Sequence, residues 1–417
     1  TAAAGYSIDN SCRFNVGDTP GLSRSITSTN TTWTFSCWAK LGTISASRVL
    51  FGYGSGRGFY FKTTTGQMTF WNDPTETNST NYYRDSSAWY HVVLKSVSGT
   101  GYTYVNGVIV AGGMASFTTP ALSSSTMYVG RFSGVLPFDG YMAEVFFTDG
   151  TAYNPSAFGE YNEDSPTIWQ PKDCAEDLTF GTDGFYLDFE DSADLGNDVS
   201  GEGNDFTPAN LAAVDQATDT PTNNFSTMNP LDNFYGASTF SEGNCKMATA
   251  TSPYTYNTGT MGMASGKWYA ECKLAASGGY SDIGMAANSS RSANDPLGTA
   301  SYAEGYAKLD ANANLCYDGS CSTYGDALAV GDVVGIYIDL DNLKLYYGID
   351  GVIQNSGTGY TIAVAAAATT SGFYRFAGGD EDGASGSTLE WNFGGCPSFA
   401  LTSAANDANG YGNFEYD

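Results

Sequence analysis

Apolar and polar residues alternate in short runs along the first 150 residues of the chain. In WTFSCWAKL the side chains of Trp33, Phe35 and Cys37 share one face, and similar runs recur between turn-rich segments. Asn106-Gly107 separates two such runs, and this dipeptide is typical of a two-residue β-hairpin turn. A period of two over short, regularly spaced segments predicts β-strands that form a sandwich or jelly roll.

The same pattern returns in the second half, most clearly in GDVVGIYIDLDNLKLYYGIDGV at residues 331–352. Val334 and Ile336 share one face of the first predicted strand, and Leu345 and Tyr347 share one face of the second. The Asp-Asn pair between the strands predicts a turn. Since each strand has one apolar face, a second sheet must cover the hairpin. No sustained helical period occurs in the sequence.

These patterns predict an all-β protein of two antiparallel β-sandwich (jelly-roll) domains joined by an ordered, loop-rich acidic connector. The first jelly roll is expected at residues 1–190, the connector at 191–239 and the second sandwich at 240–396. Residues 397–417 are expected to be a C-terminal segment that continues in a longer protein. Aromatic residues within the connector region favour an ordered segment over a flexible linker.

The composition narrows the possible partners. The chain has 17 basic and 44 acidic residues and a formal net charge of −27, which repels nucleic acid and anionic membranes. No run of 18 apolar residues is present, so no membrane insertion is expected. The 29 tyrosines and 24 phenylalanines supply enough apolar area for folded domains, which excludes a disordered acidic tail.

The sequence lacks a recognisable set of catalytic residues. Glucanases with a jelly-roll fold carry a Glu-x-Asp-x-(x)-Glu strand, because hydrolysis needs two carboxyl groups across one cleft. No such spacing occurs here, so we expect no enzyme. The only histidine, His91, lies in the apolar run WYHVVL and is interpreted as a packed structural residue.

An acidic, turn-rich segment is a candidate calcium site. Asp191, Asp194, Asp198 and Asp205 lie close together in sequence, and Ca²⁺ binds six to eight oxygen ligands. The alternative is that these carboxylates cap turns through hydrogen bonds to nearby backbone amides. Calcium is therefore the one cofactor that the sequence suggests, and the turn-capping interpretation is preferred.

The eight cysteines include one closely spaced pair. In CYDGSC, Cys316 and Cys321 could close a small loop as a disulfide. The alternative is that both are buried free thiols, as is common in proteins that fold in the cytosol.

Loops rich in aromatic and polar residues are candidates for ligand binding. Glycan-binding proteins stack an aromatic ring on a sugar face and add a few fixed polar groups. The candidate residues are Tyr53, Arg57, Trp71, Tyr82, Tyr83, Arg84, Tyr280, Arg291 and Tyr317. Since tyrosine is abundant in this chain, the alternative is that each of them belongs to the framework of its sandwich.

Several blocks resemble known families. SGKWYAECKL, DIGMA, the hairpin at 331–352 and LEWNFG follow the order of a SPRY (B30.2-like) signature, except that Leu343 stands where that family usually has Gly. SCRFN, WTFSCWAK, WYHVVL, YVNGV and FDGYMAEVFFTDG resemble a laminin-G-like, concanavalin A-like jelly roll. The SPRY resemblance implies binding rather than catalysis, because SPRY domains bind partners through loops at one rim.

Further blocks are similar to segments of virion proteins from tailed phages, marine phages in particular. They include DGYMAEVFFTDGTAYNPSAFGE, LGNDVSGEGNDFTPANL and TDTPTNNFSTMNP. This resemblance implies a phage virion appendage protein. It places the chain on the virion surface, after folding in the cytoplasm of the infected host.

The leading functional hypothesis is a non-enzymatic tail fibre or similar appendage that binds a host surface glycan or protein through sandwich loops. The alternative is a capsid decoration or head-fibre protein, and a polysaccharide depolymerase is disfavoured. The expected partners are other virion proteins and a host cell-surface glycan or protein. A homo-oligomer is expected, with a trimer favoured, because weak contacts gain from multivalency.

Overall fold

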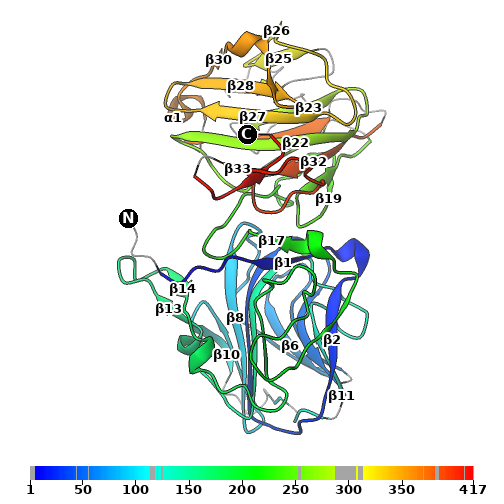
Figure 1. Ribbon diagram of the computed structural model, residues 1–417, viewed down its shortest axis with the longest axis vertical. Helices are drawn as coiled ribbons and strands as arrows, with labels where there is room; N and C mark the ends of the chain where they lie inside the picture. The colour runs from blue at the N-terminus through cyan, green and yellow to red at the C-terminus, as the bar shows by residue number, and fades with distance from the viewer. Residues whose placement is uncertain are drawn as a thin grey trace. The chain divides into compact units, whose positions relative to one another are not determined.

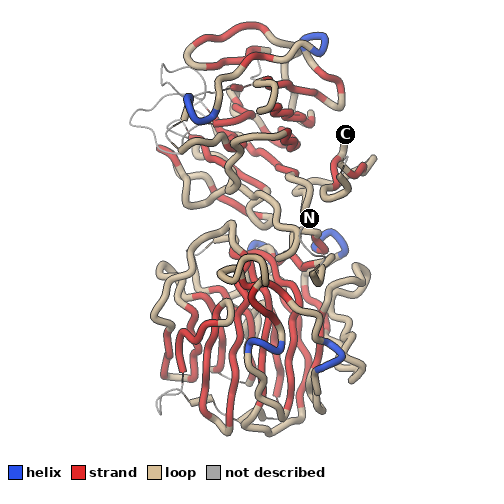
Figure 2. Tube along the Cα trace, turned by 90° about the vertical axis from the view of Figure 1, so that its left-hand side faces the viewer, coloured by secondary structure: helices blue, strands red, loops and turns tan. Residues whose placement is uncertain are grey.

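The computed structural model describes residues 5–43, 45–54, 56–112, 118–119, 121–123, 125–251, 255–286, 307–308, 313–369, 371–380, 385–407 and 409–416. The chain divides into two compact units, Thr1–Asn224 and Phe225–Asp417 (Figure 1). Antiparallel strands make up most of the regular structure in each unit, which confirms the all-β prediction (Figure 2). In the described residues, no helix is long and apolar enough to span a membrane.

The first unit is a sandwich of two antiparallel sheets. The first sheet has the strand order β10 (Val108–Gly112), β9 (Thr100–Val105), β8 (Trp89–Val97), β3 (Trp33–Leu41), β12 (Gly140–Asp149), β1 (Ser11–Phe14) and β17 (Gln216–Ala217), with β15 (Phe185–Leu187) also paired to β12. The second has the order β16 (Thr207–Ala209), β2 (Gly21–Ile26), β11 (Ser125–Val129), β4 (Arg48–Tyr53), β5 (Arg57–Phe61), β6 (Met68–Asn72) and β7 (Thr75–Asn78).

The alternating pattern of the sequence fills the space between these sheets. Trp33, Phe35 and Phe51 are fully buried there, and the rings of Phe35 and Phe51 stack with centroids 4.5 Å apart. The predicted hairpin turn is confirmed, because Asn106 and Gly107 both have positive φ and lie between the paired residues at the ends of β9 and β10. Positive φ at both central positions is what a type I′ turn requires.

A third layer covers the outer face of the first sheet. It consists of η2 (Pro155–Ala157), β13 (Gly159–Tyr161), β14 (Trp169–Pro171) and η3 (Ala175–Asp177) with their loops. Alternate residues of a strand point to opposite faces, so Val92 enters the core between the sheets while Val93 enters a second apolar cluster beneath this layer. Phe146 and Tyr186 stack in that cluster with centroids 4.2 Å apart. The third layer creates the site described below.

Residues 191–224, which the sequence assigned to the connector, lie within the first unit. Within this segment, β16 pairs with β2 and β17 pairs with β1. The side chains of Leu195 and Phe206 join the main core of the first unit. Strands of two and three residues carry no readable period, which is why the sequence pattern did not reveal them. The boundary between the compact units lies at Asn224.

The second unit is also a sandwich of antiparallel sheets. One sheet has the order β18 (Phe234–Tyr235), β21 (Thr255–Thr258), β31 (Arg375–Asp380), β23 (Ser281–Ala286) and β24 (Ala307–Lys308). The other has the order β19 (Thr239–Ser241), β20 (Lys246–Ala248), β32 (Thr388–Asn392), β22 (Lys267–Ala276), β27 (Val333–Asp339), β28 (Lys344–Ile349) and β29 (Val352–Ile353), with β30 (Tyr360–Thr361) also paired to β28.

The hairpin at 331–352 has the predicted form. Val334, Ile336, Leu345 and Tyr347 are fully buried in the core of the second unit. Leu343, at the end of the turn, has φ of 55°, a conformation that glycine adopts more easily. The remaining elements are η1 (Val16–Asp18), η4 (Ala213–Asp215), β25 (Asn314–Tyr317), β26 (Ser320–Thr323), η5 (Asn355–Gly357), α1 (Ala365–Ala368), β33 (Ala405–Asn406) and β34 (Asn413–Phe414).

Candidate functional site

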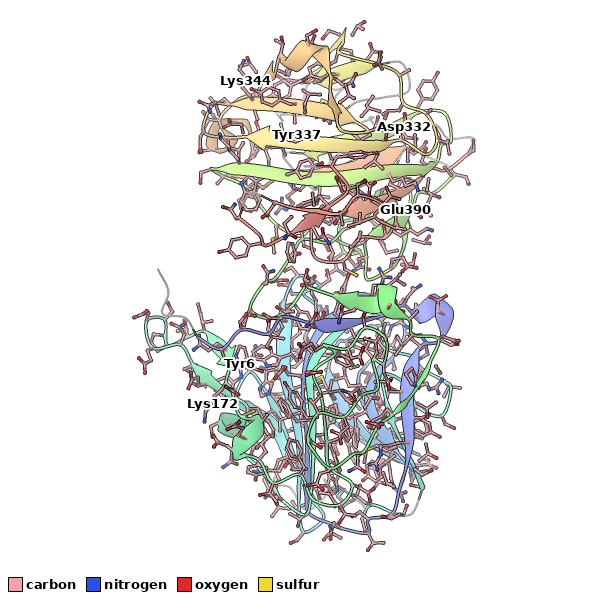
Figure 3. The ribbon with its side chains drawn as sticks, viewed as in Figure 1. Tyr6, Lys172, Asp332, Tyr337, Lys344 and Glu390 are labelled. Carbon is pink, nitrogen blue, oxygen red and sulfur yellow. A yellow bond between two sulfur atoms is a disulfide. The ribbon has the colours of Figure 1, made fainter. Side chains whose placement is uncertain are left out.

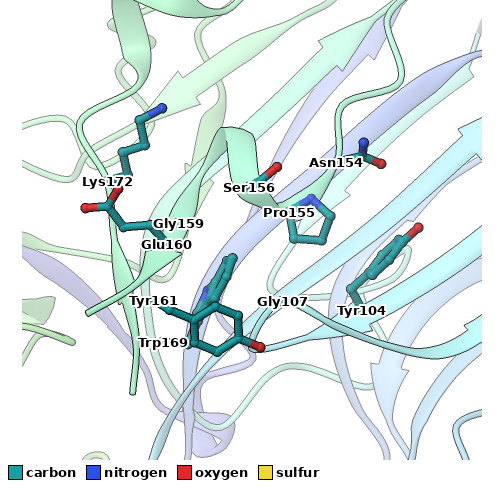
Figure 4. A pocket seen from close by; sticks show the side chains of 10 residues that line it. All are labelled: Tyr104, Gly107, Asn154, Pro155, Ser156, Gly159, Glu160, Tyr161, Trp169 and Lys172. Carbon is teal, nitrogen blue, oxygen red and sulfur yellow. The ribbon is translucent and has the colours of Figure 1, made fainter. Parts of the chain in front are cut away.

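A pocket of about 600 Å³ opens between the third layer and the β9–β10 hairpin of the first unit (Figure 4). It combines three aromatic rings with amide, hydroxyl, carboxylate and ammonium groups. The lining residues are Tyr104, Gly107, Asn154, Pro155, Ser156, Gly159, Glu160, Tyr161, Trp169 and Lys172. They come from β9 and the turn after it, from η2 with its flanks, and from the β13–β14 pair.

Trp169 is fixed in this pocket by close backbone contacts. A Cβ atom built on Gly107 would lie 2.5 Å from Cζ3 of the indole, and one built on Gly159 would lie 2.7 Å from Nε1. The two glycines therefore allow the ring to pack directly on main chain. Tyr161, with 46% of its surface exposed, meets Trp169 edge to face, with centroids 5.0 Å apart and an interplanar angle of 80°.

Two polar side chains of the wall, Asn154 and Glu160, also have hydrogen-bond partners. Lys95 Nζ donates a hydrogen bond of 2.7 Å to Asn154 Oδ1, and it lies 5.1 and 5.4 Å from the ring centroids of Tyr102 and Tyr104. Lysine has only donors, so Asn154 must turn its oxygen toward Lys95, and its NH₂ group stays available to a ligand. Burial lowers the pKa of Lys95. Glu160 Oε1 accepts a hydrogen bond from Gln170 Nε2 at 3.4 Å.

His91 lies behind Trp169 and is almost completely buried. Trp169 Nε1 donates to His91 Nδ1 at 3.0 Å, and His91 Nε2 lies 2.9 Å from Ser36 Oγ. Its ring also packs on Trp38, with centroids 5.0 Å apart. Burial lowers the pKa of His91 to about 3, so the imidazole is neutral at physiological pH. The structure thus agrees with a packed histidine and adds a hydrogen-bonded link to the pocket.

The binding residues predicted in the first unit lie away from this pocket. Tyr53 is fully buried in the core, beside Trp33 and Phe51, which corrects its prediction as a ligand contact. The sequence around it looked like a loop, but Tyr53 ends strand β4 with its ring facing inward. Arg57 lies 5.8 Å from the centroid of that ring. Trp71 packs edge to face on Phe132.

Three of the predicted residues do come together at the surface. Tyr82 has 59% of its surface exposed, and Cζ of Arg84 lies 5.1 Å from its ring centroid. Tyr83, next to them, packs edge to face on Tyr90 with centroids 5.3 Å apart. These three residues are not among those lining the pocket. A ligand-binding role for them stays a prediction.

The predicted residues of the second unit are more scattered. Tyr280 is 46% exposed. The hydroxyl of Tyr317 accepts a 2.8 Å hydrogen bond from the backbone N–H of Ala363, so this tyrosine supports the framework. Arg291 lies outside the described residues. Cys316 and Cys321 are directly opposite in the β25–β26 pair and are joined as a disulfide.

The acidic segment proposed for calcium is folded as a series of turns. Asp191 Oδ1 and Asp194 Oδ1 accept hydrogen bonds from the backbone N–H groups of Ala193 and Gly196. The carboxylate oxygens of Asp198 accept hydrogen bonds from Tyr186, Ser200 and Asn204, and Asp205 Oδ1 accepts one from the N–H of Asp198. Within the described ranges, no group of three or more His, Cys, Asp or Glu side chains could hold a metal ion. The geometry favours the turn-capping interpretation.

A buried carboxyl group that the sequence interpretation missed lies on β12. Tyr186 Oη donates to Glu144 Oε1 at 2.7 Å, and the hydroxyl of Tyr6, which is labelled in Figure 3, donates to Oε2 at 3.1 Å. Burial raises the pKa of Glu144 to about 7. Glu144 has φ of 51° beside a register shift in β12, a position typical of a β-bulge. The detectable signal was a Glu within the apolar run YMAEVFF.

Comparisons with known proteins agree with this fold. Residues 17–152 match the Laminin_G_3 family model, described as concanavalin A-like lectin/glucanases superfamily. Over these residues the first unit is thus similar to a concanavalin A-like jelly roll. A search of curated proteins finds no match to this sequence.

Several solved structures are similar to parts of the chain. A putative carbohydrate-binding protein from Bacteroides ovatus has 17% identity and a TM-score of 0.29, over 36% of this chain and 46% of that one. The SPRY domain of human HERC1 has 13% identity and a TM-score of 0.32, over 42% of this chain and 99% of that one. Domain 4 of AbnA, an arabinanase from Geobacillus stearothermophilus, was solved in complex with arabinotriose. It has 17% identity and a TM-score of 0.26, over 31% of this chain and 65% of that one. Similarity at this level says nothing about ligand or activity.

Proposed function

We propose that the first unit is a non-enzymatic glycan-binding module and that the pocket beside Trp169 is its binding site. The observation that carries this proposal is the composition of the pocket wall. Tyr104, Tyr161 and Trp169 supply aromatic surface, and Asn154 and Glu160 supply a fixed donor and an acceptor. Sugars present apolar C–H faces between hydroxyl groups, so such a wall complements them.

The size and charge of the pocket support the same ligand class. A volume of about 600 Å³ lies within the range of small-molecule sites and leaves room for more than one sugar ring. The net charge of −27 on the chain disfavours polyanions such as nucleic acid. The pocket itself is mixed in charge, with Lys172 and Glu160 both in its wall. A neutral or weakly charged glycan is therefore favoured.

A catalytic role is disfavoured because the pocket has one carboxyl group. Glu160 is the only acidic residue among the ten that line it. Glycoside hydrolysis uses two carboxyl groups about 5–10 Å apart, one as acid and one as base or nucleophile. Glu144 has a pKa suited to proton transfer but is buried and is not part of the pocket wall.

We further propose that this module acts on the surface of a phage particle, as part of a tail fibre or similar appendage. The support is the similarity of three sequence blocks to segments of phage virion proteins. These blocks are DGYMAEVFFTDGTAYNPSAFGE, LGNDVSGEGNDFTPANL and TDTPTNNFSTMNP. In this role the chain binds a host cell-surface glycan, contacts other virion proteins and forms a homo-oligomer, with a trimer favoured. Cryo-EM of intact particles tests the location, since density at capsomer centres would instead indicate a capsid decoration protein.

A glycan array probed with the full chain tests the binding proposal, followed by calorimetry with the best ligand. Tyr161→Ala removes an exposed ring from the pocket and is expected to weaken binding about 10-fold, the loss of one stacking contact. Glu160→Gln is expected to weaken it several-fold. Tyr82→Ala is the control, because this exposed tyrosine does not line the pocket. Binding that survives both pocket variants but is lost with Tyr82→Ala would place the site at the Tyr82–Arg84 cluster instead.

A further inference from the structure

A chain of hydrogen bonds runs inward from the pocket through three buried or half-buried side chains. Trp169 Nε1 lies 3.0 Å from His91 Nδ1, and His91 Nε2 lies 2.9 Å from Ser36 Oγ. The planes of the indole and imidazole rings are 20° apart, and the N···N distance of 3.0 Å lies within the usual range for a hydrogen bond. This is favourable geometry for a hydrogen bond between two aromatic rings.

We infer that His91 is a positioning residue for the pocket, which holds Trp169 in the orientation that a glycan meets. The inference rests on the proposed function of the pocket. His91 does not line the pocket and acts through the indole of Trp169. Ser36 fixes the other side of the imidazole, and both residues project from neighbouring strands, with Ser36 on β3 and His91 on β8.

The hydrogen bond between Trp169 and His91 defines one tautomer of His91. An indole N–H can only donate, so Nδ1 of His91 must be the acceptor and cannot carry a proton. The single proton of the neutral imidazole is then on Nε2, which donates to Ser36 Oγ. A protonated imidazole would set an N–H against the indole N–H and break the link. The pKa of about 3 for His91 keeps the imidazole in the neutral form.

This link also limits what Trp169 offers to a ligand. The N–H is the only polar group of an indole, and here it is used by His91. Trp169 therefore presents only apolar ring surface, suited to the C–H face of a sugar. Recognition of the hydroxyl groups then depends on Asn154, Glu160 and Lys172.

Nuclear magnetic resonance of the full chain tests the tautomer directly, because His91 is the only histidine. In ¹⁵N spectra of the wild-type protein we expect an unprotonated Nδ1 and a protonated Nε2. Addition of the best array glycan at saturation is expected to shift the Nδ1 signal, since the ligand contacts the ring that donates to it. A protonated Nδ1 would overturn the inference.

Two variants separate positioning from simple packing. His91→Asn keeps an acceptor near the position of Nδ1, and we expect glycan affinity within about 3-fold of the wild type, the effect of one imperfect hydrogen bond. His91→Phe keeps an aromatic ring but has no acceptor, and we expect a loss of about 10-fold or more. Thermal unfolding of both variants reports whether the unit still folds.

The outcomes distinguish this inference from the proposed function. If no glycan binds the wild-type chain, the function fails, while the tautomer measurement still decides the His91–Trp169 link. If a glycan binds and His91→Phe binds as tightly as the wild type, the positioning role is wrong and the function stands. If His91→Phe does not fold, we compare the glycan affinity of His91→Asn with that of Trp169→Phe, which lacks the indole N–H. That comparison decides whether an acceptor at residue 91 matters.

Discussion

Lys40 and Asp219 form an ion pair in the interior of the first unit. Nζ of Lys40 lies 2.7 Å from Oδ2 of Asp219, and the two side chains are only 1% and 2% exposed. Trp89 Nε1 donates to the other carboxylate oxygen at 3.1 Å, and Lys40 Nζ also donates to Asn224 Oδ1 at 2.8 Å. The pair therefore ties the last residues of the unit to strands β3 and β8.

We expect Lys40→Met to destabilise the first unit by about 3–5 kcal/mol, because it leaves the Asp219 carboxylate buried without the Lys40 cation. Urea unfolding followed by tryptophan fluorescence measures this change. Lys62→Met is the matched control, since the Lys62–Glu76 pair is 30% and 36% exposed and such pairs contribute about 1 kcal/mol or less. Equal losses in the two variants would contradict a special role for the buried pair. The double variant Lys40→Met/Asp219→Asn is expected to recover part of the stability.

The carboxyl group of Glu144 is expected to make the first unit less stable as pH rises. Its pKa is raised from 4.5 to about 7, so the folded state binds the proton more tightly than the unfolded state. The resulting stabilisation is fully present below pH 4.5 and is lost as pH rises through about 7. Its size is about 3 kcal/mol, from 1.36 kcal/mol per pKa unit.

Glu144→Gln tests this pH dependence, because glutamine resembles the protonated acid and does not titrate. Urea unfolding between pH 4 and 8 is expected to show a fall in wild-type stability that Glu144→Gln lacks. Glu163→Gln, which changes an exposed carboxyl group in the same unit, is the control and should follow the wild type. Parallel pH profiles for the wild type and Glu144→Gln would show that the shift at Glu144 does not govern stability.

The strand pattern was readable because burial on one face of a strand leaves a local signature. Trp33 and Phe35, or Val334 and Ile336, alternate with residues of the other face, and the structure buries them as expected. Tyr53 was misjudged because glycines around it suggested a loop, although its ring completes the core. Glycine content reports backbone freedom and not the direction of a neighbouring side chain.

The pocket could not be predicted from local sequence, because it depends on contacts between distant residues. Trp169 and His91 are 78 positions apart, and only the fold brings the indole N–H to the imidazole. The sequence did identify His91 as a packed residue, without relating it to Trp169. The sequence contained no signal that His91 supports Trp169, because a hydrogen bond between two side chains leaves no periodic pattern along the chain.

Gly107→Ala is expected to displace Trp169 and abolish most glycan binding. The new Cβ would lie 2.5 Å from the indole, which cannot remain in place. Gly134→Ala is a matched control, because Gly134 has φ of 79° against 78° for Gly107 and nothing within 4 Å of its added Cβ. Both variants share the cost of a left-handed alanine, about 1 kcal/mol. Calorimetry should show that glycan affinity falls about 10-fold or more in Gly107→Ala and not in Gly134→Ala. Equal binding by the two variants would exclude Trp169 from the site.

In the second unit, Glu271 holds the segment Asn413–Tyr416 against strand β22. The Glu271 side chain is fully buried, and its oxygens accept hydrogen bonds from the backbone N–H groups of Glu415 and Tyr416 at 2.9 and 2.7 Å. Tyr269 Oη and Asn392 Nδ2 donate to the same carboxylate at 2.9 and 3.0 Å. The two backbone N–H groups and Asn392 Nδ2 can only donate, and between them they approach both oxygens of Glu271, so both positions must accept, which a carboxylate allows and an amide does not.

Glu271→Gln is therefore expected to release this segment, because the new NH₂ group faces a donor. The cost of such an unmatched buried group is about 1–3 kcal/mol. Hydrogen exchange of the Glu415 and Tyr416 amides should become much faster, while amides in β27 stay protected. Glu390→Gln is the control, since Glu390 pairs with the partly exposed Lys246 and contacts neither amide. Unchanged exchange at residues 415 and 416 in Glu271→Gln would mean that packing of Phe414 on Tyr269, with centroids 4.8 Å apart, is enough to hold the segment.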